Sequence, residues 1–105
     1  CYDTGHENVQ GTCFRMLEEF GHRLFTVHVH DNAGSDTHTL PFEGTIDWSG
    51  FRHVLHGLRY SGNLLLEVSL KNSQFKDQTA FLSQARECAE RLLQPPAKTT
   101  GDCSA

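Results

Sequence analysis

Apolar and polar positions alternate along two short segments of the chain in the way expected of β-strands. In residues 24–30, apolar side chains at Phe25, Val27 and Val29 alternate with polar ones at Thr26, His28 and His30. Residues 63–68 carry three consecutive leucines before Glu67, which is typical of a strand buried on both faces. Residues 1–3 have the character of a strand end, so three strands are predicted.

Helical spacing appears in the segments between and after these strands. Phe14, Leu17 and Phe20 predict a helix over residues 12–20, capped by Thr12 and stopped by Gly21. A second helix is predicted over residues 47–58, with Asp47 or Ser49 as its cap. The third and longest covers residues 75–93, with an apolar side made of Phe75, Leu82, Ala85, Ala89, Leu92 and Leu93.

The predicted order of elements alternates strand and helix, which indicates an α/β fold with parallel strands and right-handed crossovers. A parallel sheet needs cover on both faces, but helices on one face only are expected here. The bare face is then covered either by a second copy in a homo-oligomer or by further strands of a closed barrel, and we favour the barrel. Residues 1–94 form the predicted domain, and residues 95–105, which begin with Pro95-Pro96, are expected to be a disordered tail.

The composition indicates which binding partners and which cellular compartment to expect. The formal net charge is −4, and the nine Lys and Arg residues form no run, which argues against a nucleic-acid surface. No apolar segment resembles a signal peptide or a membrane span, so we expect no membrane partner. The four cysteines include no CxxC pair, and we expect reduced thiols in a cytoplasmic protein.

Candidate metal ligands fall at the carboxyl ends of the three predicted strands. Asp3 ends the first strand, His28 lies near the end of the second, and Glu67 ends the third. Each alone has an ordinary explanation, since Asp is a common turn residue and most strand histidines are structural. Together they lie at the sheet edge where α/β active sites are built, and they suit a divalent metal: Mg²⁺, Mn²⁺, Zn²⁺ or Co²⁺.

The loop over residues 31–46 adds a second polar cluster beside this edge. His30, Asp31, Asp36 and His38 lie within nine residues, and Asp36-Thr-His38 is a D-x-H pair. Three readings stay open for them: ligands of a second metal, groups that hydrogen-bond His28, or groups that bind substrate hydroxyls. The loop contains three acidic residues and no Lys or Arg.

Taken together, these motifs resemble the xylose isomerase-like TIM-barrel superfamily. The resemblance rests on Asp3-Thr-Gly-His6, on the segment from His28 to His38, on Pro41 to Trp48, and on Leu66-Glu67. It implies that the chain is the C-terminal part of a (β/α)8 barrel, from the end of strand 6 through helix 8. One departure is Phe42, which stands where the family often has the first glycine of Pro-Gly-x-Gly, and we expect either an altered loop backbone or an aromatic facing the substrate.

The resemblance also implies roles for individual residues. Asp3, His28 and Glu67 match metal ligands, and Glu67 also matches a catalytic acid/base group. His6, Asp36 and His38 match residues that bind substrate or a further metal. His30 and Asp31 are expected to support the ligands through hydrogen bonds. A fourth ligand, a Glu, would come from an earlier strand that this chain does not contain.

The implied activity is that of a metal-dependent isomerase or epimerase acting on a sugar or sugar phosphate. A proton would move between neighbouring carbons through an enediolate, in the full-length protein rather than in this fragment alone. The alternative is an endonuclease IV-like, metal-dependent enzyme that cleaves at abasic DNA sites, favoured by the D-x-H pair and opposed by the acidic charge. A third reading is a non-catalytic fragment.

Overall fold

A computed structural model describes residues 1–95 of the chain. Its sheet has three parallel strands in the order β1 (Tyr2–Asp3), β2 (Val27–Val29) and β3 (Leu64–Leu66). The pairing places Asp3 opposite His28, and His28 opposite Leu65. Residues opposite one another in parallel strands point to the same face, so these three side chains share one face of the sheet.

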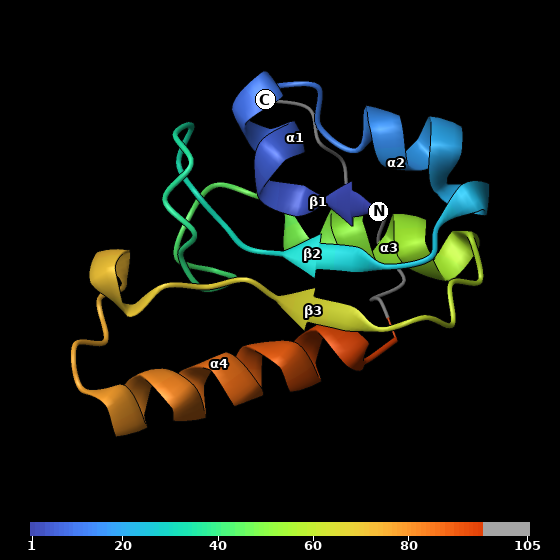
Figure 1. Cartoon of the computed structure of the whole chain (residues 1–105). Helices are drawn as coiled ribbons and strands as arrows, with labels where there is room; N and C mark the ends of the chain where they lie inside the picture. Colours follow the sequence, from blue (N-terminus) through green and yellow to red (C-terminus); the bar gives the residue numbers. More distant parts are fainter. Residues whose placement is uncertain (96–105) are drawn as a thin grey trace.

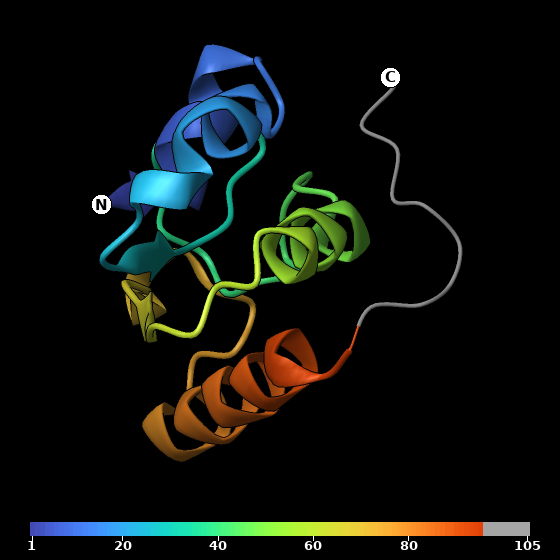
Figure 2. The ribbon, with the colours of Figure 1, turned by 90° about the vertical axis from the view of Figure 1, so that its right-hand side faces the viewer.

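The helices gather on one side of this sheet, as expected from the sequence. They are α1 (Thr4–Gln10), α2 (Arg15–Phe20), α3 (Trp48–Gly57) and α4 (Gln78–Leu93), with short 3-10 turns η1 (Gly21–Arg23) and η2 (Leu70–Asn72). Figure 1 views the opposite side, with α3 behind the strands, and Figure 2 shows the helices fanning around one side of the sheet. The sheet face toward the viewer in Figure 1 is not covered by any described helix.

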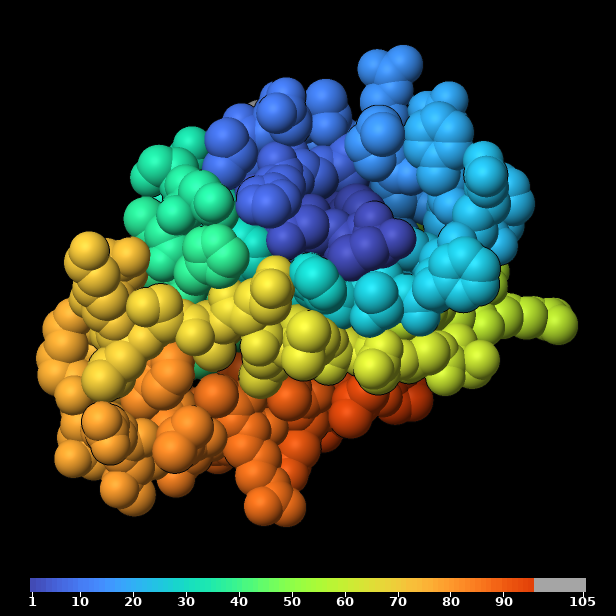
Figure 3. All heavy atoms as spheres, in the orientation of Figure 1, coloured from blue at the N-terminus to red at the C-terminus, as the bar shows by residue number. Residues whose placement is uncertain are grey.

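The core lies between the strands and these helices. Val27 and Val29 of β2 are fully buried against Leu17 of α2 and Phe51 of α3. A second apolar cluster joins α4 to the loop that follows β2, through the buried residues Leu40, Phe81, Ala85 and Cys88. The bare face, by contrast, leaves Leu65 49% exposed, and Figure 3 shows the strand residues at the surface there.

The N-terminal segment differs from the single helix predicted over residues 12–20. Asp3 caps an unpredicted helix, α1, by accepting a hydrogen bond from the His6 amide at 2.9 Å. Thr12 caps nothing, because its hydroxyl donates to the buried Glu7 carboxylate at 2.7 Å. Glu7 also accepts from the Met16 amide at 2.8 Å, so one carboxylate ties α1 to α2.

Two predictions made from the spacing of apolar residues, one for the strand over residues 24–30 and one for the helix over residues 75–93, are also wrong in part. Phe25 precedes β2 and is 90% exposed, because regular strand structure begins only at Val27. On α4, Leu82 and Leu93 are exposed, whereas Phe81, Ala85, Cys88 and Leu92 form the buried stripe. The α3 prediction is confirmed, with Asp47 as its cap at 3.0 Å from the Gly50 amide.

The remaining expectations concern the chain ends, the thiols and the membrane. Cys1 and Cys88 have free thiols, but Cys13 is disulfide-bonded, so the expectation of four reduced cysteines is wrong. Apart from Pro95, the predicted disordered tail lies outside the described residues. Within residues 1–95, none of the helices has the length and apolar character needed to span a bilayer.

Candidate metal centre

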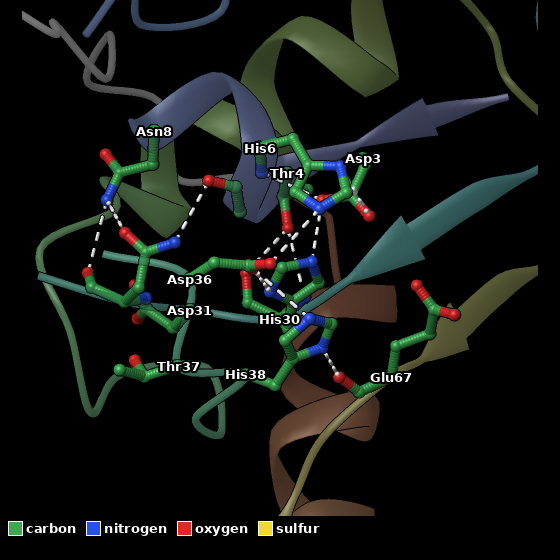
Figure 4. A network of polar contacts seen from close by, with 12 residues as sticks. Asp3, Thr4, His6, Asn8, His30, Asp31, Asp36, Thr37, His38 and Glu67 are labelled. Atoms are coloured by element: carbon green, nitrogen blue, oxygen red, sulfur yellow. Dashed lines mark hydrogen bonds and ion pairs between the residues drawn. The ribbon is translucent and has the colours of Figure 1, made fainter. Parts of the chain in front are cut away.

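The polar residues at the carboxyl ends of the three strands converge in the structure. Asp3 ends β1, His30 follows β2 directly, and Glu67 follows β3. Figure 4 shows Asp3 and His30 beside His6 from α1 and Asp36 and His38 from the loop, with the Glu67 backbone carbonyl against His38 and its side chain to one side. The arrangement follows from the parallel topology, which brings the carboxyl ends of all three strands to one edge.

Two groups of side chains have the spacing of a metal site. In one, ligand atoms of Asp3, His30 and Glu67 lie within 4.8 Å of one another. In the other, the same limit holds for His6, His30, Asp36 and His38. Ligands of a tetrahedral ion with bonds of about 2.1 Å lie roughly 3.4 Å apart, so modest side-chain shifts would bring either group to an ion. His30 belongs to both groups.

His30 is the most buried residue of these two metal-spaced groups. Its side chain is fully buried, and Nε2 lies 2.7 Å from Asp3 Oδ1, while Nδ1 lies 3.9 Å from Asp36 Oδ1. Neither ring nitrogen makes a hydrogen bond of good geometry within the described residues. Burial lowers the pKa of this imidazole from its usual value, although the neighbouring Asp3 carboxylate opposes the shift. A neutral imidazole is the form that binds a metal.

The place of the His30 ring is fixed by the residues that follow β1. Thr4 Oγ1 donates to the His30 carbonyl at 2.8 Å, and the His30 amide donates back to the same oxygen at 3.0 Å. A Cβ on Gly5 would lie 2.1 Å from His30 Cε1, so the ring occupies space that only glycine leaves free. On its other side the ring stacks on His38, with 3.8 Å between centroids.

His38 presents one nitrogen to the cluster and uses the other for support. Its Nδ1 lies 2.7 Å from the Glu67 carbonyl oxygen, which can only accept, so Nδ1 carries the proton. This hydrogen bond is the largest cause of a raised His38 pKa, with Asp36 acting in the same direction. In the neutral ring, Nε2 is left with a lone pair 3.2 Å from Asp36 Oδ1. This is the geometry of a ligand held by a backbone carbonyl.

His28 lies in neither metal-spaced group. Its Nδ1 is 2.9 Å from Glu67 Oε1, and both side chains are partly exposed on the bare face of the sheet. The predicted trio of Asp3, His28 and Glu67 therefore meets only in part: His28 reaches Glu67, and His30 takes the position beside Asp3 and Glu67. His28 sits where it can orient the carboxylate of Glu67.

Asp31 has a different environment from its neighbours in the cluster. Its fully buried carboxylate accepts hydrogen bonds from the backbone amides of Asn32, Phe42, Gly44 and Ile46 and from the Trp48 indole, at 2.8–3.2 Å. Its backbone also pairs with Thr39 in an isolated antiparallel bridge, which folds back the segment that carries Asp36 and His38. Asp31 thus supports the site by shaping the loop, without contacting the expected His28.

Phe42 adopts the conformation of the glycine it replaces, with φ at 78°. Its ring faces away from the cluster, because the Arg91 guanidinium of α4 lies 3.6 Å from the ring centroid and Trp48 packs at 6.2 Å. Of the two expectations for this position, the structure favours an unusual backbone over an aromatic facing the substrate.

His6, Asp36 and His38 lie in one group with His30. The D-x-H spacing pointed to Asp36 and His38, and the family resemblance pointed to His6. Sequence reasoning did not find the central place of His30. The strand alternation gave His28 and His30 the same face, so pattern alone could not choose between them. The signal that was available is Gly5, the small residue that follows Asp3 by two and leaves room for the ring.

Comparison with known proteins agrees with this architecture. Residues 1–87 match the family described as xylose isomerase-like TIM barrel. The chain belongs to this family. The family includes sugar isomerases and endonuclease IV-like enzymes. The parallel strands, the one-sided helices and the open sheet edges are those of part of such a barrel.

A relative in Sinorhizobium fredii, the uncharacterized protein y4fM, is 33% identical over 94 residues. The match covers 88% of this chain but only 30% of the relative. The chain therefore spans about a third of the length of the relative it matches. No solved structure matches it.

The donor set fits the divalent metals that the family commonly binds. Carboxylate oxygens and imidazole nitrogens are ligands of Zn²⁺, Mn²⁺ and Co²⁺. The buried His30 nitrogens lack hydrogen bonds of good geometry, and leaving such polar atoms unsatisfied is costly unless a ligand completes them. The residues of these two groups therefore fit a divalent ion.

Proposed function

We propose that this chain carries part of the active site of a metal-dependent sugar or sugar phosphate isomerase or epimerase. The observation that carries the proposal is the convergence of Asp3, His30 and Glu67 at the carboxyl edge of three parallel strands in a xylose isomerase-like barrel. The activity belongs to the whole protein, of which this chain supplies one wall of the site.

Asp3, Glu67 and the His30 imidazole would hold a divalent ion. When bound, such an ion supplies Lewis-acid polarisation of a substrate carbonyl. Asp3 Oδ1 lies 2.7 Å from His30 Nε2, so the carboxylate and the ring nitrogen would face the same ion. His6 is 62% exposed at the mouth of the cluster, where an imidazole can bind a sugar hydroxyl.

Glu67 is the residue proposed to move the proton. Its carboxylate is 38% exposed on the bare face of the sheet, where the barrel interior would hold the substrate. His28, 2.9 Å away, orients this carboxylate and can share its proton. Proton transfer between neighbouring carbons needs a base of this kind close to the substrate carbon.

The test is turnover by the whole protein with Mn²⁺, Co²⁺, Mg²⁺ or Zn²⁺ across a panel of ketoses, aldoses and their phosphates. We expect interconversion of at least one pair, abolished by chelation and reduced by about 10²–10⁴-fold in Glu67→Gln, the size expected on losing a general base. His53→Gln, an exposed imidazole on α3, is the matched control and should keep wild-type turnover. Activity that survives both chelation and Glu67→Gln would refute the assignment.

A second candidate is an endonuclease IV-like enzyme acting at abasic sites. The grouping of His6, Asp36 and His38 favours it, because the resemblance to endonuclease IV implies that the Asp36-Thr-His38 pair binds a further metal. The loop from 31 to 46 opposes it, because its three carboxylates and lack of Lys or Arg would repel a phosphodiester backbone. Efficient incision of abasic duplex DNA, weakened steeply by salt, without turnover of any sugar, would establish this alternative.

A further inference from the structure

We propose that a cavity between α3 and α4, at the edge of the sheet opposite the candidate metal centre, binds a small carboxylate with an apolar body. The cavity has a volume of about 190 Å³ and lies beside Leu64, the first residue of β3, whereas Glu67 follows the last. Pockets for drug-sized ligands have volumes of roughly 300–1,000 Å³, so this smaller cavity suits a ligand of a few carbon atoms. The inference is independent of the proposed enzymatic activity and of any metal.

Arg52 of α3 supplies positive charge to this cavity. Its Nη1 donates to the Arg91 carbonyl oxygen near the end of α4 at 3.0 Å, so the guanidinium lies between the two helices. Its Nε is buried and has no hydrogen-bond acceptor within residues 1–95. A buried donor without an acceptor is costly, so a bound molecule that supplies the acceptor would be stabilising. The edge of a guanidinium formed by Nε and Nη2 can bind both oxygens of a carboxylate.

The charges around the cavity favour an anion. Among the described residues that line it, Arg52 and His56 can be cationic and none is acidic. Residues 48–66, which form α3, β3 and the segment between them, contain two arginines, two histidines and no Asp or Glu. The candidate metal centre instead gathers three carboxylates at the other edge of the sheet. The field of the protein therefore attracts an anion to the edge where this cavity lies.

The apolar part of the lining favours a carboxylate over a more strongly hydrated anion. It consists mainly of four leucines from α3, β3 and α4, namely Leu55, Leu64, Leu92 and Leu93. These side chains would bury an alkyl group beside the guanidinium and so add a hydrophobic contribution to binding. Inorganic phosphate has no apolar part to bury, and its acceptor oxygens need more donors than one guanidinium offers. We therefore expect butanoate to bind more tightly than phosphate.

Titration of the whole protein with butanoate tests the proposal without any measurement of turnover. With ¹⁵N-labelled arginine, the Arg52 Nε–H signal should shift as butanoate binds. Arg52→Gln assigns that signal by removing it, and should weaken binding at least about tenfold. Arg59→Gln, at an exposed arginine outside the cavity lining, is the matched control and should bind as wild type. Butan-1-ol, which has the same alkyl chain without the charge, and inorganic phosphate should each bind at least about tenfold more weakly than butanoate.

Butanoate that binds Arg52→Gln as tightly as wild type, or no more tightly than butan-1-ol, would overturn the proposal. So would the absence of saturable butanoate binding, or phosphate that binds as tightly as butanoate. If Arg52→Gln fails to fold, Gln94→Glu decides, because it preserves the side-chain shape, keeps Arg52 and adds a negative charge to the lining. It should weaken butanoate binding about threefold, and an affinity equal to that of wild type would contradict the site.

Discussion

At the scale of single residues, the structure separates two histidines and two aspartates that the sequence places side by side. His28 and His30 share a strand face, yet His28 contacts Glu67 on the bare side while His30 is sealed between Gly5 and His38. Asp31 and Asp36 share a loop, yet Asp31 is fully buried and Asp36 is 48% exposed among imidazoles. Sequence spacing does not distinguish the two residues of each pair. Their different burial in the structure indicates their different roles.

Asp31→Asn tests whether that carboxylate holds the loop. The side-chain amide would point an NH₂ group at backbone amides that need an acceptor, leaving buried donors unsatisfied. We expect the free energy of unfolding of the whole protein to fall by about 3 kcal/mol, measured by urea denaturation. Asp77→Asn makes the same chemical change at the α4 cap, where Asn serves equally well, and should cost less than about 0.5 kcal/mol. Equal effects of the two substitutions would contradict this role for Asp31.

At the scale of elements, a helix was predicted correctly where its apolar spacing and its capping residue agreed. The prediction failed where a contact with a distant part of the chain determines the structure. The α3 helix follows from Asp47 and its apolar spacing, and the cap forms as expected. The α1 helix was missed because Asp3 was interpreted as a metal ligand or a turn residue, whereas its side chain also caps the helix. The α4 helix was found, but its buried side is set by the loop residue Leu40, which no local pattern could reveal.

Packing of α4 against that loop makes a prediction about thiol reactivity. Cys88 is buried and donates its S–H to the Pro41 carbonyl at 3.3 Å, and burial raises the pKa of its thiol. A raised pKa means less thiolate at a given pH, so Cys88 should resist alkylation near pH 7.5. Exposed Cys1 should react with iodoacetamide at least tenfold faster, as measured by mass spectrometry of modified peptides. If Cys88 and Cys1 of the folded protein were alkylated at comparable rates, α4 would not shield the Cys88 thiol from solvent.

At the scale of the whole molecule, the sheet is open where a barrel would continue. Within residues 1–95, the outer edges of β1 and β3 pair with no other strand. Beside β1 lies a cavity of about 430 Å³, whose lining includes apolar Leu17, Phe20 and Leu24 and polar Asp3 and His6. The sequence predicted this one-sided architecture because three parallel strands with so few helices cannot cover both faces.

We expect residues 1–95 to self-associate when they are expressed alone, because one face of the sheet is uncovered. Leu65, at 49% exposure, and the apolar lining beside β1 should drive self-association, detected by sedimentation velocity. Leu65→Glu should reduce it by placing a charge on the face that associates, whereas Leu82→Glu, on the solvent side of α4, should not. A monomeric sample of the unmodified chain with a cooperative melt at high temperature would contradict the incomplete-barrel account.

The central claim is that Glu67 moves a proton between neighbouring carbons of a metal-bound sugar. The most direct measurement is turnover by the whole, metal-loaded protein in D₂O, with the product analysed by NMR for deuterium at the carbon beside the carbonyl. The account predicts deuterium at that carbon, at a rate that falls at least 10²-fold in Glu67→Gln. Complete conversion of the sugar with no deuterium in the product, at a rate unchanged by Glu67→Gln, would contradict it.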